Sequence, residues 1–214
     1  MNNAPSCNSV RAPVKLFLAS SNPGKLKEYR ILAEADAPSS VRVDLALVPE
    51  CASLPAFEEN AATFAENAAG KALHYSRMQE GLIFADDSGL VVPALGGAPG
   101  VLSARYAGVA ATNSQRIEKL LEEMCDLTRE KRGAHFVCAI ALARQGRALA
   151  VVTDRVDGEI LRETRGAGGF GYDPVFYFQP LKKTFAELSA EEKNRHSHRG
   201  KAFRKLFVAL SSML

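Results

Sequence analysis

Residues 82–90 read Leu-Ile-Phe-Ala-Asp-Asp-Ser-Gly-Leu, and the rest of the chain is organised around this stretch. Its four leading apolar residues predict the last part of a buried strand, and Gly89 would let the backbone bend sharply just after it. This places Asp86 and Asp87 at a strand end. Because adjacent residues of an extended strand point to opposite faces, we expect the two carboxylates to have different roles.

Two interpretations of these carboxylates are open. Both aspartates could cap turns, as Asp-Asp-Ser-Gly sequences commonly do. Alternatively, they could form a site for a hard cation such as Mg²⁺, which prefers oxygen ligands and is usually held by one or two carboxylates plus substrate phosphates. The second interpretation requires phosphate-binding groups elsewhere in the chain.

The composition indicates an ordinary globular protein. The 214 residues suffice for one domain, or two lobes of one, and 47% hydrophobic with 24% charged residues argues against disorder. A net charge of +3 is too small to indicate nucleic-acid binding by itself. Residues 1–13, which are rich in Asn, Ser and Pro, predict a flexible tail, and residues 14–214 a single domain.

The cysteines and the apolar runs bear on the compartment. Cys7, Cys51, Cys125 and Cys138 are widely spaced without a Cys-x-x-Cys pair, so we expect neither a zinc site nor a disulfide framework. A reducing cytoplasm is the expected location. No apolar run approaches the roughly 18 to 20 residues that a membrane span needs, and no signal-peptide pattern is expected at the N-terminus.

A strand, a tight turn and a helix are predicted first. Residues 14–19 are apolar and strand-like, and a helical pattern follows, with Asn22 suited to the N-cap and Pro23 to the first helical position. The turn would point backbone N–H groups, the positive helix end and Lys25 at one place, where an anion could bind. An ordinary capped helix with a surface lysine explains the pattern equally well.

Further elements follow from periodicity. A helix is predicted over 63–78, with Asn67 and Lys71 on one face, and its neighbour in sequence, Glu59, could be packed close to the Asp86-Asp87 strand. A lone helical lysine is more often solvated. The remaining predictions are strands over 41–45, 135–143, 148–156 and 158–162 and helices over 112–125, 191–195 and beyond Gly200.

Two segments near the C-terminus carry further polar and aromatic residues. Residues 166–171 match Gly-x-Gly-x-x-Gly, but Pro174 soon follows and disfavours the helix that a dinucleotide site requires. A loop whose Phe170 stacks on a base and whose Asp173 bonds a ring edge is one interpretation, and a surface loop with one buried aromatic is the other. His196, His198 and Arg199 could form a base pocket, a nucleic-acid patch or, least favoured, a metal site.

Taken together and in this order, these segments resemble the inosine triphosphate pyrophosphatase family from about Val14 to the C-terminus. Each motif alone is weak, but the ordered set is very specific. The motifs are residues 21–25, Glu59 with 63–68, 85–90, 96–100 with 103–105, 169–174, and 197–200.

The resemblance implies an enzyme that cleanses the nucleotide pool. Family members hydrolyse inosine- and xanthosine-type purine triphosphates (ITP, dITP, XTP) to the monophosphate and pyrophosphate. The implied fold is α/β, with a mixed central sheet flanked by helices and two lobes with an active-site cleft between them. The implied cofactor is Mg²⁺, and the implied assembly is a homodimer, with neither membrane nor nucleic acid as a partner.

Residue by residue, the resemblance assigns Asp87 as the metal-associated proton acceptor and Glu59 as a second metal contact. The substrate would be held by Ser20, Ser21, Asn22, Pro23, Gly24, Lys25, Lys71, Ser88, Phe170, Gly171, Tyr172, Asp173, Lys193, His198 and Arg199. Asp87 with Mg²⁺ would activate water, and Lys25 and Lys71 would neutralise the departing pyrophosphate. Fixed donors such as His198 and Arg199 would favour a 6-oxo purine over adenine, although they would not exclude GTP.

Two rival functions remain. A related pyrophosphatase type acts on pyrimidine or modified nucleotides, but residues 170–173 with His198 and Arg199 match the purine-type pocket. A non-catalytic nucleic-acid-binding module built on Lys182, Lys183 and residues 193–204 would show steep salt dependence and no metal requirement. That module leaves the carboxylates of residues 59, 86 and 87 unexplained.

Overall fold

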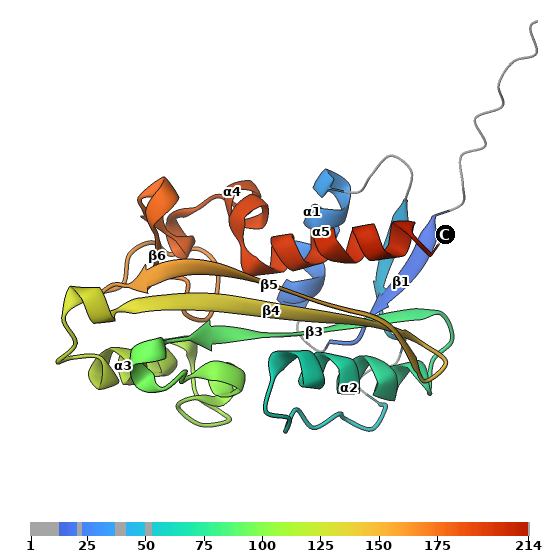
Figure 1. Ribbon diagram of the computed structural model, residues 1–214, viewed down its shortest axis with the longest axis horizontal. Coiled ribbons are helices and arrows are strands. Elements are labelled where there is room, and N and C mark those ends of the chain that lie inside the picture. The colour runs from blue at the N-terminus through green and yellow to red at the C-terminus, as the bar shows by residue number, and fades with distance from the viewer. Residues whose placement is uncertain (1–12, 21–22, 37–41, 50–52, 214) are drawn as a thin grey trace, which may run out of the picture.

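The computed structural model describes residues 13–20, 23–36, 42–49 and 53–213, and it contains one mixed sheet of seven strands (Figure 1). The strand order is β2-β1-β3-β4-β5-β6-β7; β1 pairs in parallel with β2 and β3, and all later neighbours are antiparallel. The strands are β1 (Val14–Leu18), β2 (Val43–Leu47), β3 (Leu82–Val91), β4 (Gly133–Arg144), β5 (Arg147–Ile160), β6 (Phe176–Phe178) and β7 (Lys183–Thr184).

Helices cover both faces of the sheet, as the mixed α/β fold class predicts. In Figure 1, α1, α4 and α5 lie above the long strands, and α2 and α3 lie below them. A short 3₁₀ helix, η2 (Gly100–Arg105), follows β3. The helices are α1 (Pro23–Asp36), α2 (Phe64–Ser76), α3 (Asn113–Glu123), α4 (Ala190–His196) and α5 (His198–Ser211).

Local sequence explains where these helices begin. Thr63 and Glu66 form a capping box at the start of α2, and Ser189 and Glu192 form another at the start of α4. The apolar stripe of α2 packs on a layer of alanines from β3 and β4, whose small side chains let the helix approach the sheet closely. The strands predicted over 135–143 and 148–156 are confirmed as β4 and β5, which pair antiparallel as a hairpin.

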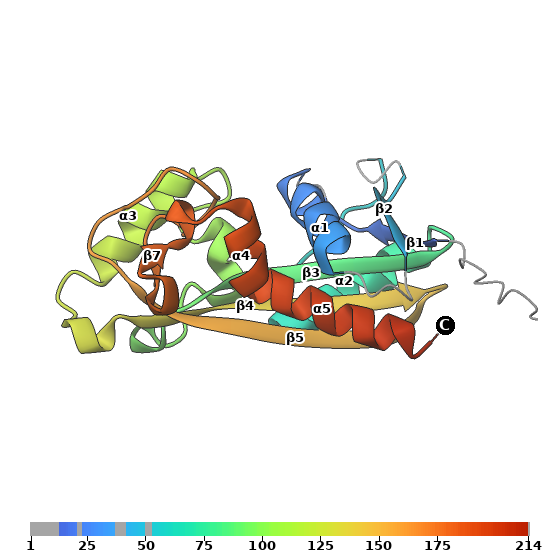
Figure 2. The ribbon, with the colours of Figure 1, turned by 90° about the horizontal axis from the view of Figure 1, so that it is seen from above.

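The core has two regions along the sheet. At one end, α1 and α5 enclose Phe84 and Phe203 on one face, while α2 covers the opposite face. At the other end, α3 and the residues around β6 enclose Phe136, Phe176 and Phe185. Figure 2 shows β3, β4 and β5 running between the two ends, so the two expected lobes share one sheet.

Strand β3 departs from the prediction. The strand does not end at Ala85 but continues through Asp86 and Asp87 to Val91, because β4 pairs with it from Ile83 to Val91. Gly89 makes no bend. A Cβ at Gly89 would lie 2.3 Å from Ser103 Oγ and 2.7 Å from Gly100 O, so the glycine admits η2 against the strand. Residues 158–162 likewise form no separate strand, since β5 is continuous to Ile160.

The pairing of β1 determines where the site lies. Its register with β3 has three pairs and ends at Leu18 and Phe84, whereas β3 continues for seven more residues to Val91. From Ala85 to Ser88, no described strand pairs with β3 on the side opposite β4, whereas further on the Leu90 N–H bonds Ser103 Oγ and Val91 is bridged to Pro99. Asp86, Asp87 and Ser88 lie on this unpaired stretch, the open edge of β3, just past the end of β1.

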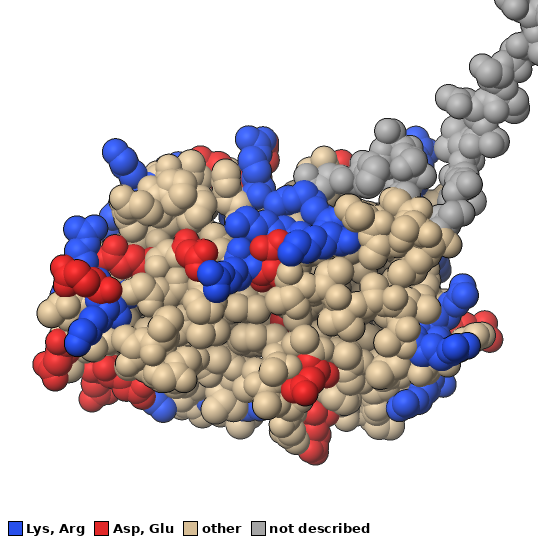
Figure 3. Space-filling model, viewed as in Figure 1, with Lys and Arg blue, Asp and Glu red and all other residues tan. Residues whose placement is uncertain are grey.

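Two surface features are relevant to function. In the described part of the chain, no helix is both long and apolar enough to cross a bilayer. On the face in Figure 3, Lys and Arg gather over the region of α4 and α5 with Asp and Glu among them, and a broad central band carries neither sign of charge.

Candidate active site

Asp86 and Asp87 point to opposite faces of β3, as their adjacency on an extended strand predicts. Asp86 contacts Lys25 from α1 and Arg199 from α5, on the upper face in Figure 1. Asp87 contacts Asn67 from α2, on the lower face. Each carboxylate therefore has its own set of partners, and the two sets meet at the open edge of β3.

The partners of Asp86 are cations. Lys25 Nζ donates to Asp86 Oδ1 at 2.9 Å, and Arg199 Nε lies 3.5 Å from Asp86 Oδ2. The Asp86 side chain is fully buried, which opposes its ionisation, yet Lys25 and Arg199 hold its pKa well below the usual value. Asp86 is thus a fixed anion that holds two positive groups beside the strand.

The environment of Asp87 has the reverse effect. Its Oδ2 accepts from Asn67 Nδ2 at 2.9 Å and its Oδ1 from the Ser88 N–H at 2.9 Å. Burial and the nearby Glu59 carboxylate raise the pKa of Asp87 to about 6, against a smaller opposing effect of Asn67 and Lys71. Asp87 is therefore the adjacent carboxylate suited to accept a proton near neutral pH.

Glu59 is held from two directions. Lys71 Nζ, from α2, donates to its Oε1, and Arg105 Nη2, from η2, donates to its backbone oxygen at 2.7 Å. Burial lowers the pKa of Lys71, but the carboxylates of Asp86 and Glu59 outweigh this and raise it above the usual value. Lys71 is consequently a buried cation next to Asp87, where sequence alone left it as a possible surface lysine.

The upper face continues into a second polar cluster around Glu28 of α1. Arg199 Nη1 donates to Glu28 Oε2, and Lys193 Nζ lies 3.2 Å from Glu28 Oε1 and 2.7 Å from Asp173 Oδ2. Burial opposes ionisation of Glu28, but Arg199 and Lys193 hold its pKa below the usual value. These contacts bring α1, α4 and α5 together with residues 166–173, the glycine-rich loop.

An aromatic ring lies over these cations. The ring of Phe170 has Lys193 Nζ 4.6 Å and the Arg199 guanidinium 5.5 Å from its centroid, and the side chain is 39% exposed. Arg199 Nη2 also donates to Ser88 Oγ at 3.1 Å. A half-exposed ring next to fixed donors is an arrangement that can hold a planar heterocycle.

His198 is buried beside this cluster. Its ring stacks on Phe136 with centroids 4.8 Å apart and planes at 12°, and its Nδ1 has no hydrogen-bond partner among the described residues. Burial, with Arg199 and Lys193 nearby, lowers the pKa of His198 well below its usual value. The imidazole is neutral at physiological pH, and its Nδ1 can form a hydrogen bond with a ligand.

The carboxylates of Asp87 and Glu59 fit a magnesium ion whose remaining ligands would include phosphate oxygens of the substrate. Among the described residues, no group of three acidic, His or Cys side chains forms a cage for a metal. Mg²⁺ does not need one, because it is commonly held by one or two carboxylates and by phosphate oxygens. Glu59 raises the pKa of Asp87, so the two carboxylates repel one another, and a divalent cation between them would relieve this repulsion.

The structure brings most of the predicted site residues to the open edge of β3. Lys25, Lys71 and Ser88 lie beside the two aspartates, whereas Phe170 and Asp173 join Lys193 and Arg199 in the cluster around Glu28. Tyr172, which was predicted to contact the substrate, is instead buried in the core around Phe136 and donates to Ser103 O. Ser20 lies after β1, and Gly24 is the second residue of α1. Ser21, Asn22 and the side chain of Pro23 lie outside the described residues.

Sequence reasoning missed some of this arrangement. Glu28 was not predicted, although it lies three residues after Lys25 and so shares a helix face with it. Asn67 was placed on the right face of α2 but was given no role, and Arg105 appeared only within a motif. Their partners come from distant parts of the chain, which periodicity does not reveal.

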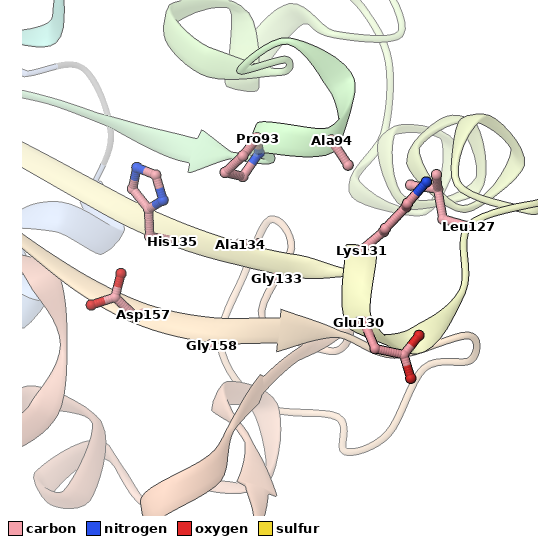
Figure 4. A pocket seen from close by; sticks show the side chains of 10 residues that line it. All are labelled: Pro93, Ala94, Leu127, Glu130, Lys131, Gly133, Ala134, His135, Asp157 and Gly158. Atoms are coloured by element: carbon pink, nitrogen blue, oxygen red, sulfur yellow. The ribbon is translucent and has the colours of Figure 1, made fainter.

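A cavity of about 700 Å³ lies elsewhere, near the start of β4 and the end of β5 (Figure 4). His135, Asp157, Lys131 and Glu130 are its titratable lining residues. None of the predicted site residues lines it. The cavity is therefore separate from the chemistry at the β3 edge.

The amino-acid sequence is similar to those of known proteins over most of its length. A model described as the Ham1 family matches residues 16–209. A protein named dITP/XTP pyrophosphatase from Desulfotalea psychrophila is 45% identical over 89% of this chain and 82% of its own length. A protein of the same name from Geobacillus kaustophilus is 48% identical over 90% of this chain and 92% of its own.

Solved structures agree with the sequence matches. A HAM1 protein from Coxiella burnetii superposes with a TM-score of 0.82 at 40% identity, covering 93% of this chain and 99% of that one. The Ham1 protein of Staphylococcus aureus gives 0.81 at 36% identity, covering 94% and 100%. The fold is thus shared across nearly the full length of this chain.

Proposed function

Since this chain belongs to the Ham1 family, we propose that it hydrolyses inosine- and xanthosine-type purine nucleoside triphosphates to the monophosphate and pyrophosphate. The observation that carries the proposal is the pair of adjacent carboxylates with opposite environments. Asp86 is held ionised by Lys25 and Arg199, while Asp87 has a pKa of about 6 next to Glu59 and Lys71. The same edge of β3 thus has a proton acceptor and cations for a phosphate chain.

In the proposed reaction, Asp87 accepts the proton of the water that attacks the α phosphorus. Asn67 donates to Asp87 Oδ2, and the Ser88 N–H donates to Asp87 Oδ1. The two hydrogen bonds together orient the carboxylate. Lys25 and Lys71 neutralise the charge that develops on the departing pyrophosphate. Asp87 and Glu59 would hold Mg²⁺, which, when bound, supplies positive charge to the phosphate oxygens and acidifies water.

The proposed base pocket lies on the Asp86 side. Phe170 would stack on the purine, and His198 and Arg199 would donate to the oxygen at position 6. Adenine carries an amino group there, so it would leave these buried donors unpaired, and polar sites of this kind discriminate by about 10⁴ or more.

Base selection can be tested with His198→Ala. We expect the ratio of kcat/KM for ITP over ATP to fall about tenfold or more, while turnover of ITP is reduced less. Arg199→Ala is a poorer probe, since it would also remove one of the two cations that Glu28 and Asp86 each contact. An unchanged ratio with a uniform loss of activity would exclude His198 from base selection.

The decisive experiment measures pyrophosphate release from ITP, XTP, GTP, ATP and dTTP, each with Mg²⁺ and with EDTA. Mg²⁺-dependent release that strongly favours ITP and XTP supports both the chemistry and the purine pocket. Preferred release from dTTP would instead indicate a pyrimidine-directed enzyme. Absence of release from all five would remove the proposed function.

The proposal includes a homodimer in a reducing cytoplasm. Exposed apolar side chains on β5 support a partner surface, since Leu149 and Val151 are 37% and 46% exposed. At these residues β5 pairs with no described strand other than β4, because β6 joins it only at Glu159 and Ile160. Light scattering after size-exclusion chromatography should give twice the chain mass, and a monomer would contradict this part of the proposal.

A further inference from the structure

The 3₁₀ helix η2 is hydrogen-bonded both to Glu59, on the Asp87 side of the candidate site, and to Tyr172 of the glycine-rich loop. At its last residue, Arg105 Nη2 donates to the backbone oxygen of Glu59 at 2.7 Å. Two residues earlier, the backbone oxygen of Ser103 accepts from Tyr172 Oη at 3.0 Å. Figure 1 shows this light-green part of the chain below β3, between α2 and α3.

The Glu59 end of this connection lies in a segment without regular structure. Residues 55–60 belong to neither helix nor strand, so no backbone ladder fixes the peptide of Glu59. Lys71 binds its carboxylate, and Arg105 binds its main chain. Because a hydrogen bond from a charged donor is stronger than one between neutral groups, Arg105 is a substantial restraint on where Glu59 lies.

The Tyr172 end belongs to the glycine-rich loop. Tyr172 is 3% exposed and packs in the core region around Phe136 and Phe176, and its hydroxyl has Ser103 O as its acceptor. Phe170, two residues earlier, lies over Lys193 and Arg199. A purine that stacks on Phe170 therefore acts on the same short loop that is bonded to η2.

The middle of η2 has no room to move independently of β3. Ser103 Oγ accepts from the Leu90 N–H at 2.9 Å and donates to Gly100 O at 2.6 Å. Gly89 lies so close to Ser103 Oγ and Gly100 O that even a methyl group would not fit. The six residues of η2 therefore pack as one unit, in which the position of Ser103 fixes the position of Arg105 two residues later.

We propose that η2 couples the base-binding loop to Glu59, with Arg105 as a positioning residue for that carboxylate. Occupation of the base side fixes Tyr172 and η2, and Arg105 then holds Glu59 where it and Asp87 bind the divalent cation. By linkage, base and cation strengthen each other's binding. The proposal rests on the proposed role of Glu59 as a metal contact.

One test measures binding without turnover. Mn²⁺ affinity is determined by electron paramagnetic resonance with and without saturating inosine, which presents the base but has no phosphate to ligate the metal. For the wild type we expect inosine to strengthen Mn²⁺ binding about five- to tenfold. Arg105→Gln and Tyr172→Phe should each reduce this factor to about one, and the double variant should show no further loss.

Two controls separate coupling from general damage. Arg162→Gln also removes an arginine that donates to backbone oxygens, those of Cys125 and Leu127, but it lies away from the site and should leave the factor unchanged. Arg105→Lys keeps one charged donor group, so it should retain part of the inosine effect on Mn²⁺ affinity. A wild type without the inosine effect, or an Arg105→Gln variant that retains it, would overturn the coupling.

A second readout needs neither metal nor nucleotide. Hydrogen exchange of amides 56–62 should accelerate in Arg105→Gln, while the amides of α3 keep wild-type exchange. Unchanged exchange at 56–62 would overturn the positioning role. Failure of the wild type to hydrolyse ITP would instead overturn the proposed function, and the exchange experiment distinguishes the two because it does not depend on hydrolysis.

Discussion

Asp86 and Asp87 show how one residue step along a strand changes the chemistry of a carboxyl group. Asp86 meets Lys25 and Arg199, and these cations lower its pKa although it is fully buried. Asp87 points the other way, where burial and Glu59 raise its pKa to about 6. The difference arises from the helices packed on the two faces, since the residue type and the strand are the same.

Asp87→Asn tests the catalytic role at this scale. We expect kcat for ITP to fall by about 10²- to 10⁴-fold, because the amide cannot accept the proton of water. Equilibrium binding of ITP should persist, since Lys25, Lys71 and the base pocket are unchanged. Titration calorimetry and pyrophosphate release check the two parts, and turnover close to that of the wild type would remove Asp87 from the mechanism.

The same substitution has a predicted effect on stability in the metal-free protein. The pKa of Asp87 is raised from 3.8 to about 6, so the folded state binds this proton more tightly than the unfolded chain. Ionised Asp87 therefore destabilises the fold, and the penalty grows as pH rises through this window and is complete above it. The shift corresponds to on the order of 2 to 3 kcal/mol.

Urea unfolding in EDTA at pH 4 and pH 8 checks this sign. Relative to the wild type, Asp87→Asn should gain about 2 kcal/mol in free energy of unfolding between the two pH values. Asn loses one acceptor towards Asn67, so its absolute stability at pH 4 is expected to be lower. Asp44→Asn, at an exposed position on β2, is the control. A flat difference across pH would show that Asp87 is not destabilised by its surroundings.

At the scale of elements, the junction of α4 and α5 orients the proposed base pocket. Ser197 ends α4 and caps α5, with its Oγ accepting from the Gly200 N–H at 3.1 Å. Gly200 allows the two helices to touch, because a Cβ there would lie 1.9 Å from the backbone oxygen of Asn194. Lys193 and Arg199 are thereby brought to the same carboxylate, Glu28.

Gly200→Ala should separate these helices. Overpacking against backbone costs about 1 to 3 kcal/mol, and the displaced Lys193 and Arg199 should raise KM for ITP more than they lower kcat. Gly133→Ala is a matched control, since a Cβ at Gly133 meets nothing within 4 Å. Chemical denaturation and steady-state kinetics measure both effects, and equal behaviour of the two variants would contradict the close-contact argument.

At the scale of the whole molecule, three long strands join the two core regions. The region around Phe203 and the region around Phe176 are both built on β4. If one region unfolded alone, half of the long strands that both regions share would lose its packing. The arrangement supports the prediction that residues 14–214 are a single domain with two lobes.

Calorimetry tests that prediction. We expect one thermal transition, with a calorimetric to van't Hoff enthalpy ratio close to one for the cooperative unit. Phe176→Ala and Phe203→Ala, one in each region, should each lower the same transition, at a cost of about 3 to 5 kcal/mol. Two resolved transitions, each shifted by only one variant, would show two domains instead.

The fold class, the main helices and the order of the motifs could be predicted from the amino-acid sequence. The capping box at Ser189, the alternation of the strands and the two strands over 135–143 and 148–156 are local signals, so they are readable without partners. The opposite orientation of Asp86 and Asp87 is local too, because it follows from the two-residue repeat of a strand.

The tertiary structure alone decided where β3 ends and which groups meet. The strand continues past Asp87 because β4 pairs along its whole length, and Gly89 is required by the approach of η2 rather than by a bend. Glu28 and Arg105 gain their roles from partners 171 and 46 residues away in sequence. Such contacts depend on how separate elements pack, so no local pattern in the chain specifies them.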